Sequence, residues 1–137
     1  MESIKYSSPK EKLENNEDPQ HRFDLILDGE IIGSAEIDYY SKPLPMYQVT
    51  LMYVDFEHKG KGYASKIMSQ VESWIKARKK PGILADAIME DDPAYGMYAK
   101  RGWVPVPEGQ GLHVFNWPKD VDMSILRGYS FRSVDVS

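Results

Sequence analysis

Residues 49–77 read VTLMYVDFEHKGKGYASKIMSQVESWIKA, and this stretch decides the fold. Alternation along a strand predicts that Val49, Leu51 and Tyr53 face one side, and that Thr50, Met52 and Val54 face the other. Because both sets are largely apolar, we expect a central strand covered on both faces. Beyond Gly62 the apolar residues recur three or four positions apart. This spacing predicts an amphipathic helix whose buried face carries Ala64, Ile67, Met68, Val71, Trp74 and Ile75.

The turn between strand and helix has the composition of an anion site. It consists of Lys59, Gly60, Lys61, Gly62, Tyr63 and Ala64. A helix start leaves about four backbone N–H groups without helical partners, and the helix dipole adds positive charge there. Glycines allow a ligand to approach the backbone, and the lysines add full charges. Two interpretations remain open at this point: a site for phosphate or pyrophosphate, and an ordinary turn with solvated lysines.

Composition limits the classes of function. The chain of 137 residues fits one domain, spanning 1–137, with a polar N-terminal segment 1–21 and a tail 119–137. Cysteine is absent, and the three histidines are too widely spaced to predict a metal site. A net charge of −4 argues against a nucleic-acid-binding protein. The polar N-terminus and the lack of a long apolar run favour a cytoplasmic protein with no membrane attachment.

The other segments predict a mixed sheet. Asp28-Gly29 is a strong hairpin signal between two strands, and Gly33 in the second suggests a bulge or twist. Asp92 and Pro93 open a short helix over 94–100, as N-cap and first-turn residue. Residues 121–126 are compatible with a helical turn, 129–136 with an edge strand or a docked tail, and 11–17 with a loop or weak helical turn. Strands are expected at 4–6, 22–27, 30–40, 83–88, 103–106 and 112–117, which gives an α/β (α+β) domain with one long crossover helix.

Two motifs, in order, resemble those of the GNAT superfamily of N-acetyltransferases. The first motif is Gln or Arg, two residues, Gly, one residue, and Gly or Ala; residues 59–64 fit it, with lysine in the first place. The second motif follows a short strand, and the matching residues here are Asp91, Ala94, Met97, Tyr98, Gly102 and Trp103. Asp91 replaces the usual Asn and Trp103 the usual Phe. The resemblance covers roughly residues 22–117 and implies a mixed, mostly antiparallel sheet. The chain has little room for the helix pair that usually covers the acceptor side.

The resemblance also implies roles for individual residues. Acetyl-coenzyme A would be the cosubstrate, and its pantetheine arm would pair with the backbone of Met52, Tyr53 and Val54. The pyrophosphate would bind the amides of residues 59–64, and Asp91 would belong to the same coenzyme site. Tyr98 would protonate the leaving thiolate, which suits a phenol with a pKa near ~10 and a thiol near ~8.5. The expected activity is acetyl transfer to an amine by direct attack.

The acceptor side is less determined. The amine could belong to a small molecule or a protein, and the exposed edge strands are compatible with a homodimer. Gln48 occupies the region where some family members carry a glutamate base, so the base stays open among Glu36, Asp38, Asp55, Glu57, His58 and a water chain. Tyr39, Tyr40 and Tyr47 fit either an acceptor cleft or a covered sheet edge. The alternatives to catalysis are a non-catalytic acyl-CoA-binding or regulatory module and an unrelated phosphate-binding domain.

Overall fold

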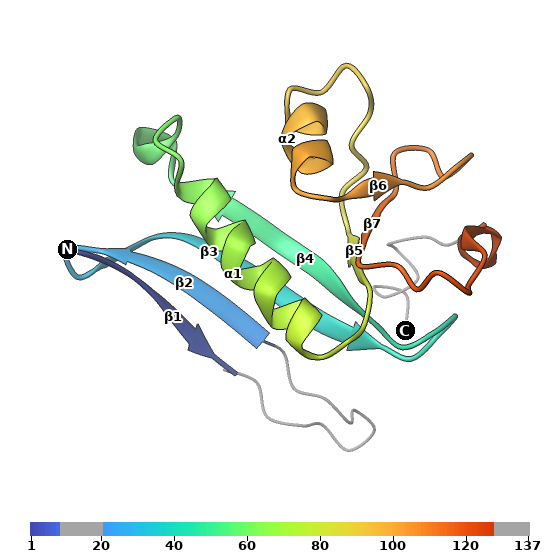
Figure 1. Cartoon of the computed structure of the whole chain (residues 1–137). Coiled ribbons are helices and arrows are strands. Elements are labelled where there is room, and N and C mark those ends of the chain that lie inside the picture. The colour runs from blue at the N-terminus through green and yellow to red at the C-terminus, as the bar shows by residue number, and fades with distance from the viewer. Residues whose placement is uncertain (9–20, 128–137) are drawn as a thin grey trace, which may run out of the picture.

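The computed structural model describes residues 1–8 and 21–127, so the expectations for 11–17 and 129–136 lie outside the described residues. The helices are α1 (Tyr63–Ala77) and α2 (Ala94–Lys100), and the 3-10 turns are η1 (Phe56–His58) and η2 (Met123–Leu126) (Figure 1). The strands are β1 (Glu2–Ser7), β2 (His21–Leu27), β3 (Glu30–Tyr40), β4 (Met46–Val54), β5 (Gly82–Leu84), β6 (Val104–Pro105) and β7 (His113–Phe115).

The described strands form one sheet of seven, in the order β1-β2-β3-β4-β5-β7-β6. Only the β4–β5 pair is parallel among these strands; the other pairs are antiparallel. A parallel pair needs a crossover, and α1 supplies it by lying across one face of the sheet (Figure 1). The predicted mixed, mostly antiparallel sheet with a long crossover helix and a second short helix is confirmed.

The β2–β3 hairpin turns at the predicted dipeptide. Asp28 and Gly29 have φ values of 50° and 86°, the pair of positive angles that a tight two-residue hairpin requires. Leu25 pairs with Gly33 and Ile26 with Ile31, which leaves Ile32 as the extra residue of a bulge beside the glycine. A Cβ on Gly33 would lie 2.8 Å from the Tyr53 carbonyl oxygen and 3.0 Å from Ile67 Cδ1. Glycine therefore allows β3, β4 and α1 to approach closely at this point.

The predicted alternation along β4 is wrong because the strand contains a bulge. Glu36 pairs with Leu51 and Ile37 with Val49, so Thr50 is the extra residue. An extra residue reverses the facing of everything on one side of it. Val49 therefore shares the α1 face with Met52, and both pack in the core beneath the helix.

The second half of β4 is partly exposed on the face opposite α1. Leu51 and Tyr53 point away from α1 and are 37% and 38% exposed. The expectation of a strand covered on both faces therefore holds only for its first half, Met46–Val49, whose residues are all buried.

The described residues bury apolar side chains on both sides of the sheet. Under α1, the main core includes Ile67, Met68, Val71 and Ile75, each 0% exposed. A smaller core on the other face consists of Met46, Ile83, Val106, Leu112, Val114 and Leu126. Leu126 comes from η2, so the helical turn expected there is confirmed. In the described part of the chain, no helix combines the length and apolar character needed to cross a membrane.

Candidate active site

β4 and β5 pair only briefly and then separate. Their register runs from Tyr47–Gly82 to Val49–Leu84, and the last bond joins the Ala85 N–H to the Val49 carbonyl at 3.0 Å. Beyond Val49, no described strand pairs with β4 on this side. The Asp55 N–H donates to the Ile32 carbonyl at 2.7 Å on the β3 side. Because backbone groups alternate along a strand, those of Met52 and Val54 point into the gap, where no strand in the described part of the chain pairs with them. We call these groups the free edge of β4.

The turn before α1 presents a second set of free backbone donors. Gly60 and Gly62 have φ values of 79° and 82°, in the left-handed region that strains any side chain. The first helical bond runs from the Lys66 N–H to the Gly62 carbonyl at 3.2 Å. The N–H groups of Tyr63, Ala64 and Ser65 therefore have no helical partner, and no side chain among residues 1–8 and 21–127 caps this end. The donor set matches what a phosphate or pyrophosphate needs.

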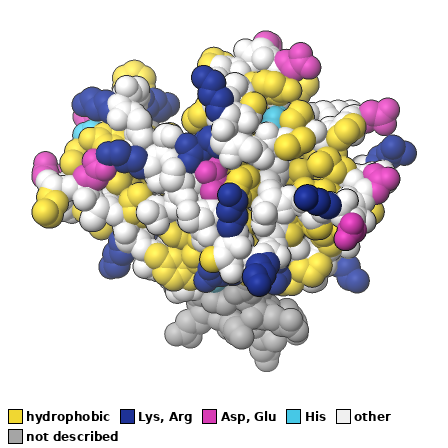
Figure 2. All heavy atoms as spheres, in the orientation of Figure 1, with side chains coloured by type: hydrophobic (Ala, Val, Ile, Leu, Met, Phe, Trp, Pro, Cys, Tyr) yellow, Lys and Arg dark blue, Asp and Glu magenta, His cyan; other side chains and the backbone are white. Residues whose placement is uncertain are grey.

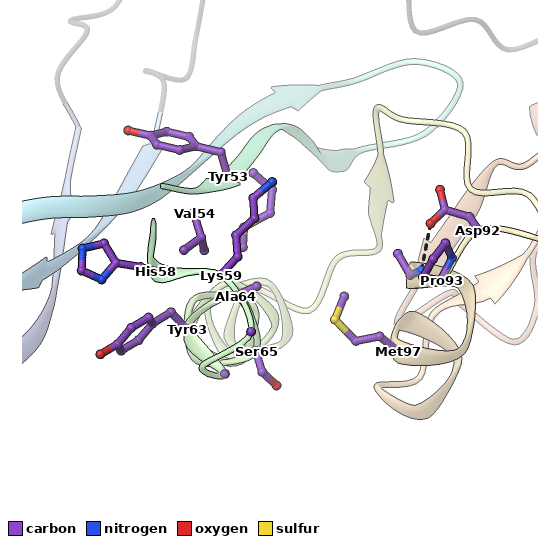
Figure 3. A pocket seen from close by; sticks show the side chains of 14 residues that line it. Tyr53, Val54, His58, Lys59, Tyr63, Ala64, Ser65, Asp92, Pro93 and Met97 are labelled. Atoms are coloured by element: carbon purple, nitrogen blue, oxygen red, sulfur yellow. Dashed lines mark hydrogen bonds between the residues drawn. The ribbon is translucent and has the colours of Figure 1, made fainter. Parts of the chain in front are cut away.

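One cleft joins the free edge and the free donors. It lies between the β4–α1 turn and α2, has a volume of ≈720 Å³, and appears in Figure 2 as a hollow between two lobes. In Figure 3, Met97 and Pro93 of the α2 wall face Ala64 and Lys59 of the α1 wall. The lining residues are Met52, Tyr53, Val54, His58, Lys59, Gly60, Gly62, Tyr63, Ala64, Ser65, Asp92, Pro93, Ala94 and Met97.

Most of the residues predicted for coenzyme binding or catalysis line this cleft, and three lie outside its lining. Lys61, which stands between the two glycines of the turn, is exposed, and so is Asp91. Tyr98 is buried on the inner side of α2.

The sequence prediction missed several lining residues. Asp92 was expected only as the N-cap of α2. The N-cap is Pro93 instead, and Asp92 Oδ1 accepts from the Ala94 N–H at 2.8 Å. The sequence did contain signals for three of them. Ala94 and Met97 are spaced by one helical turn, which puts them on the same side of α2, and Ser65 lies in the first turn of α1. The residues not predicted for the coenzyme site are His58, Ser65, Asp92, Pro93, Ala94 and Met97.

Tyr98 is a residue of α2 that packs in the main core. It is 8% exposed, and its ring meets Trp103 edge-on with centroids 6.0 Å apart. Burial raises the pKa of the phenol, and the negative charges of Asp86 and Glu72 raise it further, while Arg101 acts in the opposite direction. The hydroxyl therefore keeps its proton throughout the neutral range.

Comparison with known proteins identifies the family. The acetyltransferase (GNAT) family matches residues 2–103 of the chain. The chain is a member of the GNAT family. Acetyl-coenzyme A is the acyl donor that this family uses. No curated protein matches the chain.

Solved GNAT structures share the fold at low sequence identity. The PaiA N-acetyltransferase of Thermoplasma acidophilum, in complex with coenzyme A, is 15% identical, with 70% of this chain and 60% of that one covered and a TM-score of 0.56. A GNAT acetyltransferase of Elizabethkingia anophelis with acetyl-CoA bound is 11% identical, with 76% of each chain covered and a TM-score of 0.59. Ard1 of Thermoplasma volcanium is 18% identical, with 68% and 66% covered and a TM-score of 0.54. The chain thus spans less than two thirds of the length of the first and third of these.

The candidates for a general base have different surroundings in this GNAT protein. Glu36 forms an ion pair with Arg22, and Asp38 accepts a hydrogen bond from the Tyr40 hydroxyl at 3.4 Å. His58 lines the cleft, and its Nδ1 is buried without a hydrogen-bond partner among the described residues. Asp55 precedes η1, and Glu57 is exposed. Tyr47, expected either at an acceptor cleft or over the sheet, is buried, and the centroid of its ring lies 4.7 Å from that of Trp74.

Proposed function

We propose that the chain binds acetyl-coenzyme A in this cleft and transfers the acetyl group to an amine. One observation carries the proposal: the free edge of β4 and the free N–H groups of α1 open into the same cleft in a member of the GNAT family. An acyl donor with amide groups in its arm and a pyrophosphate at its end fits both features at once.

The charges of the cleft would set the direction of the ligand. Lys59 and the start of α1 are positive, whereas Asp92 lies on the α2 wall. The pyrophosphate would therefore bind at the turn, and the amide groups of the arm would pair with the backbone of Met52 and Val54. Met97 would shield the arm from water.

In the reaction we propose, the amine nitrogen attacks the thioester carbonyl, a C–N bond forms and the C–S bond breaks. Tyr98 would donate its proton to the sulfur as the C–S bond breaks, and the phenolate would then recover a proton from water. This transfer is uphill, because the phenol pKa near ~10 lies above the thiol pKa near ~8.5 and burial raises the phenol pKa further. The nitrogen's proton would pass to a base or to water. His58 is the base candidate that lines the cleft.

A second function is a non-catalytic acyl-CoA-binding module. It is favoured by the position of Tyr98, which is buried and outside the residues that line the cleft. Such a module would use the same free edge and helix start without proton transfer.

The two functions separate in one pair of measurements. Melting is recorded with acetyl-CoA and with ATP, and thiol release is then measured with a panel of small amines and amino-terminal peptides. A ligand at about 100 times its Kd should stabilise the fold by roughly 2.7 kcal/mol. Stabilisation by acetyl-CoA with thiol release supports the transferase, and stabilisation without release supports the binding module. No stabilisation by acetyl-CoA would exclude both.

A further inference from the structure

Arg101, which follows α2 directly, reaches across to α1. Its Nε and Nη2 donate to the two carboxylate oxygens of Glu72, at 3.0 and 2.9 Å. Its Nη1 donates to Ser65 Oγ at 2.6 Å and its Nη2 to Ser69 Oγ at 2.5 Å. One guanidinium therefore contacts three successive turns of the opposite helix.

The centre of this network is buried and its charges are matched. Glu72 is 8% exposed, and the Trp103 indole N–H adds a third donor to its carboxylate at 2.7 Å. Hydrogen bonds between charged groups with a fixed fork geometry are strong and directional. The position of the guanidinium beside α1 is thus fixed by Glu72 rather than by the serines.

Ser65 differs from Ser69 in what lies on its other side. Both hydroxyls accept from Arg101, but Ser65 lines the cleft, whereas Ser69 lies one turn further along α1 and does not. A hydroxyl oxygen that accepts from a guanidinium still has its own proton to donate. The bond from Arg101 also polarises that O–H group. Ser65 Oγ lies in the same first turn as the free N–H groups of α1.

We propose that Arg101 is a positioning residue that holds the Ser65 hydroxyl as a donor to a phosphate group of the ligand in the cleft. The inference rests on the proposed function, since it needs a phosphate-bearing ligand at the start of α1.

The test is isothermal titration of the full chain with coenzyme A and with acetylpantetheine, which carries the arm but no phosphate. Ser65→Ala should weaken coenzyme A binding by about tenfold or more, the effect of one hydrogen bond to a charged group. The same substitution should change the affinity for acetylpantetheine by less than about twofold. Ser69→Ala is the matched control: it removes the same kind of bond from Arg101 and should leave coenzyme A within about twofold.

Arg101→Lys supplies the readout that distinguishes positioning from stability. This substitution should weaken coenzyme A binding about as much as Ser65→Ala. The variant that combines Ser65→Ala with Arg101→Lys should bind coenzyme A at most about twofold more weakly than Arg101→Lys alone, because both substitutions remove the same hydrogen bond. Arg22→Lys alters an ion-paired arginine on the other face and should lower the melting temperature without changing coenzyme A binding.

Three results would overturn the inference: equal effects of Ser65→Ala and Ser69→Ala, equal weakening of both ligands, or additive losses in the double variant. If Arg101→Lys does not fold, the comparison of the two serines decides alone. If the unaltered chain does not bind coenzyme A, the proposed function fails, which is distinct from binding that the serine variants leave unchanged.

Discussion

The two walls of the cleft are built in different ways. The first wall is a continuous stretch, from β4 through the turn into α1, and its geometry follows from neighbouring residues. The second wall is α2, a helix of 7 residues, too short to be stable alone. Its end is joined to α1 by Arg101, which is 29 residues from Glu72 and 36 from Ser65 in the sequence. A site can thus combine a locally encoded half with a half that depends on distant side chains.

The largest expected effect concerns the chemistry of the α2 wall. Tyr98→Phe should lower turnover by about 100-fold, the usual scale for losing a general acid, while coenzyme A binds within about twofold of normal. Steady-state kinetics with the best amine measures it. Tyr95→Phe is the control, because Tyr95 lies on the same helix with its ring 5.4 Å from His113. Unchanged turnover in Tyr98→Phe would remove this residue from the mechanism.

The next effect contrasts a glycine from each wall. Gly62→Ala places a side chain at φ 82°, at a cost of about 1–2 kcal/mol, and should weaken coenzyme A binding roughly tenfold by distorting the turn. Gly96→Ala lies within α2, where a Cβ meets nothing within 4 Å, and should stabilise the fold by about 0.5–1 kcal/mol. Titration and melting measure both. Similar losses of coenzyme A binding in the two variants would contradict the conclusion that the backbone of this turn shapes the first wall.

A smaller effect tests the lysines of the turn. Lys59→Gln should weaken coenzyme A about threefold at low salt, and less at high salt, because Lys59 lines the cleft and its charge is screened by ions. Lys61→Gln should change binding little, since Lys61 is exposed outside the lining. Titrations at two salt concentrations compare them. A larger loss from Lys61→Gln would place the anion on the other side of the turn.

The smallest effect is the pH dependence of stability that Tyr98 contributes. Its pKa is raised in the folded protein, so above the ordinary phenol pKa of about 10 the unfolded chain releases a proton that the folded chain retains. Unfolding is then favoured as the pH rises through this range, whereas below it Tyr98 adds no pH dependence. Between about pH 9 and about pH 11, the wild-type melting temperature should fall a few degrees more than that of Tyr98→Phe. If the melting temperatures of the two proteins fall in parallel as the pH rises, the Tyr98 phenol has the same pKa in the folded and unfolded states.

The same contrast explains what the sequence could predict. The hairpin at Asp28-Gly29, the turn before α1 and the limits of α2 depend on local chemistry, and the structure has them where they were expected. The bulge at Thr50 depends on pairing with β3, so a strict alternation of β4 could not show it. β5 ends at Leu84 rather than at residue 88, because the chain leaves the sheet at the exposed residues Asp86 and Ala87.

For the candidate site, the sequence located the first wall well and the second only in part. Lys59, Gly62 and Ala64 line the cleft as the motif predicts. Asp91 is outside the lining of the cleft, whereas its neighbour Asp92 is part of it. The roles of all these residues in binding and catalysis stay predictions.

The free edge of β4 has a consequence for handling the protein. Its unpaired backbone groups at Met52 and Val54 are also what a strand of another molecule would pair with. A coenzyme arm bound along this edge would occupy those groups and compete with such pairing. Concentrated samples should therefore stay clear for longer when coenzyme A is added, which would make this ligand useful as a formulation additive.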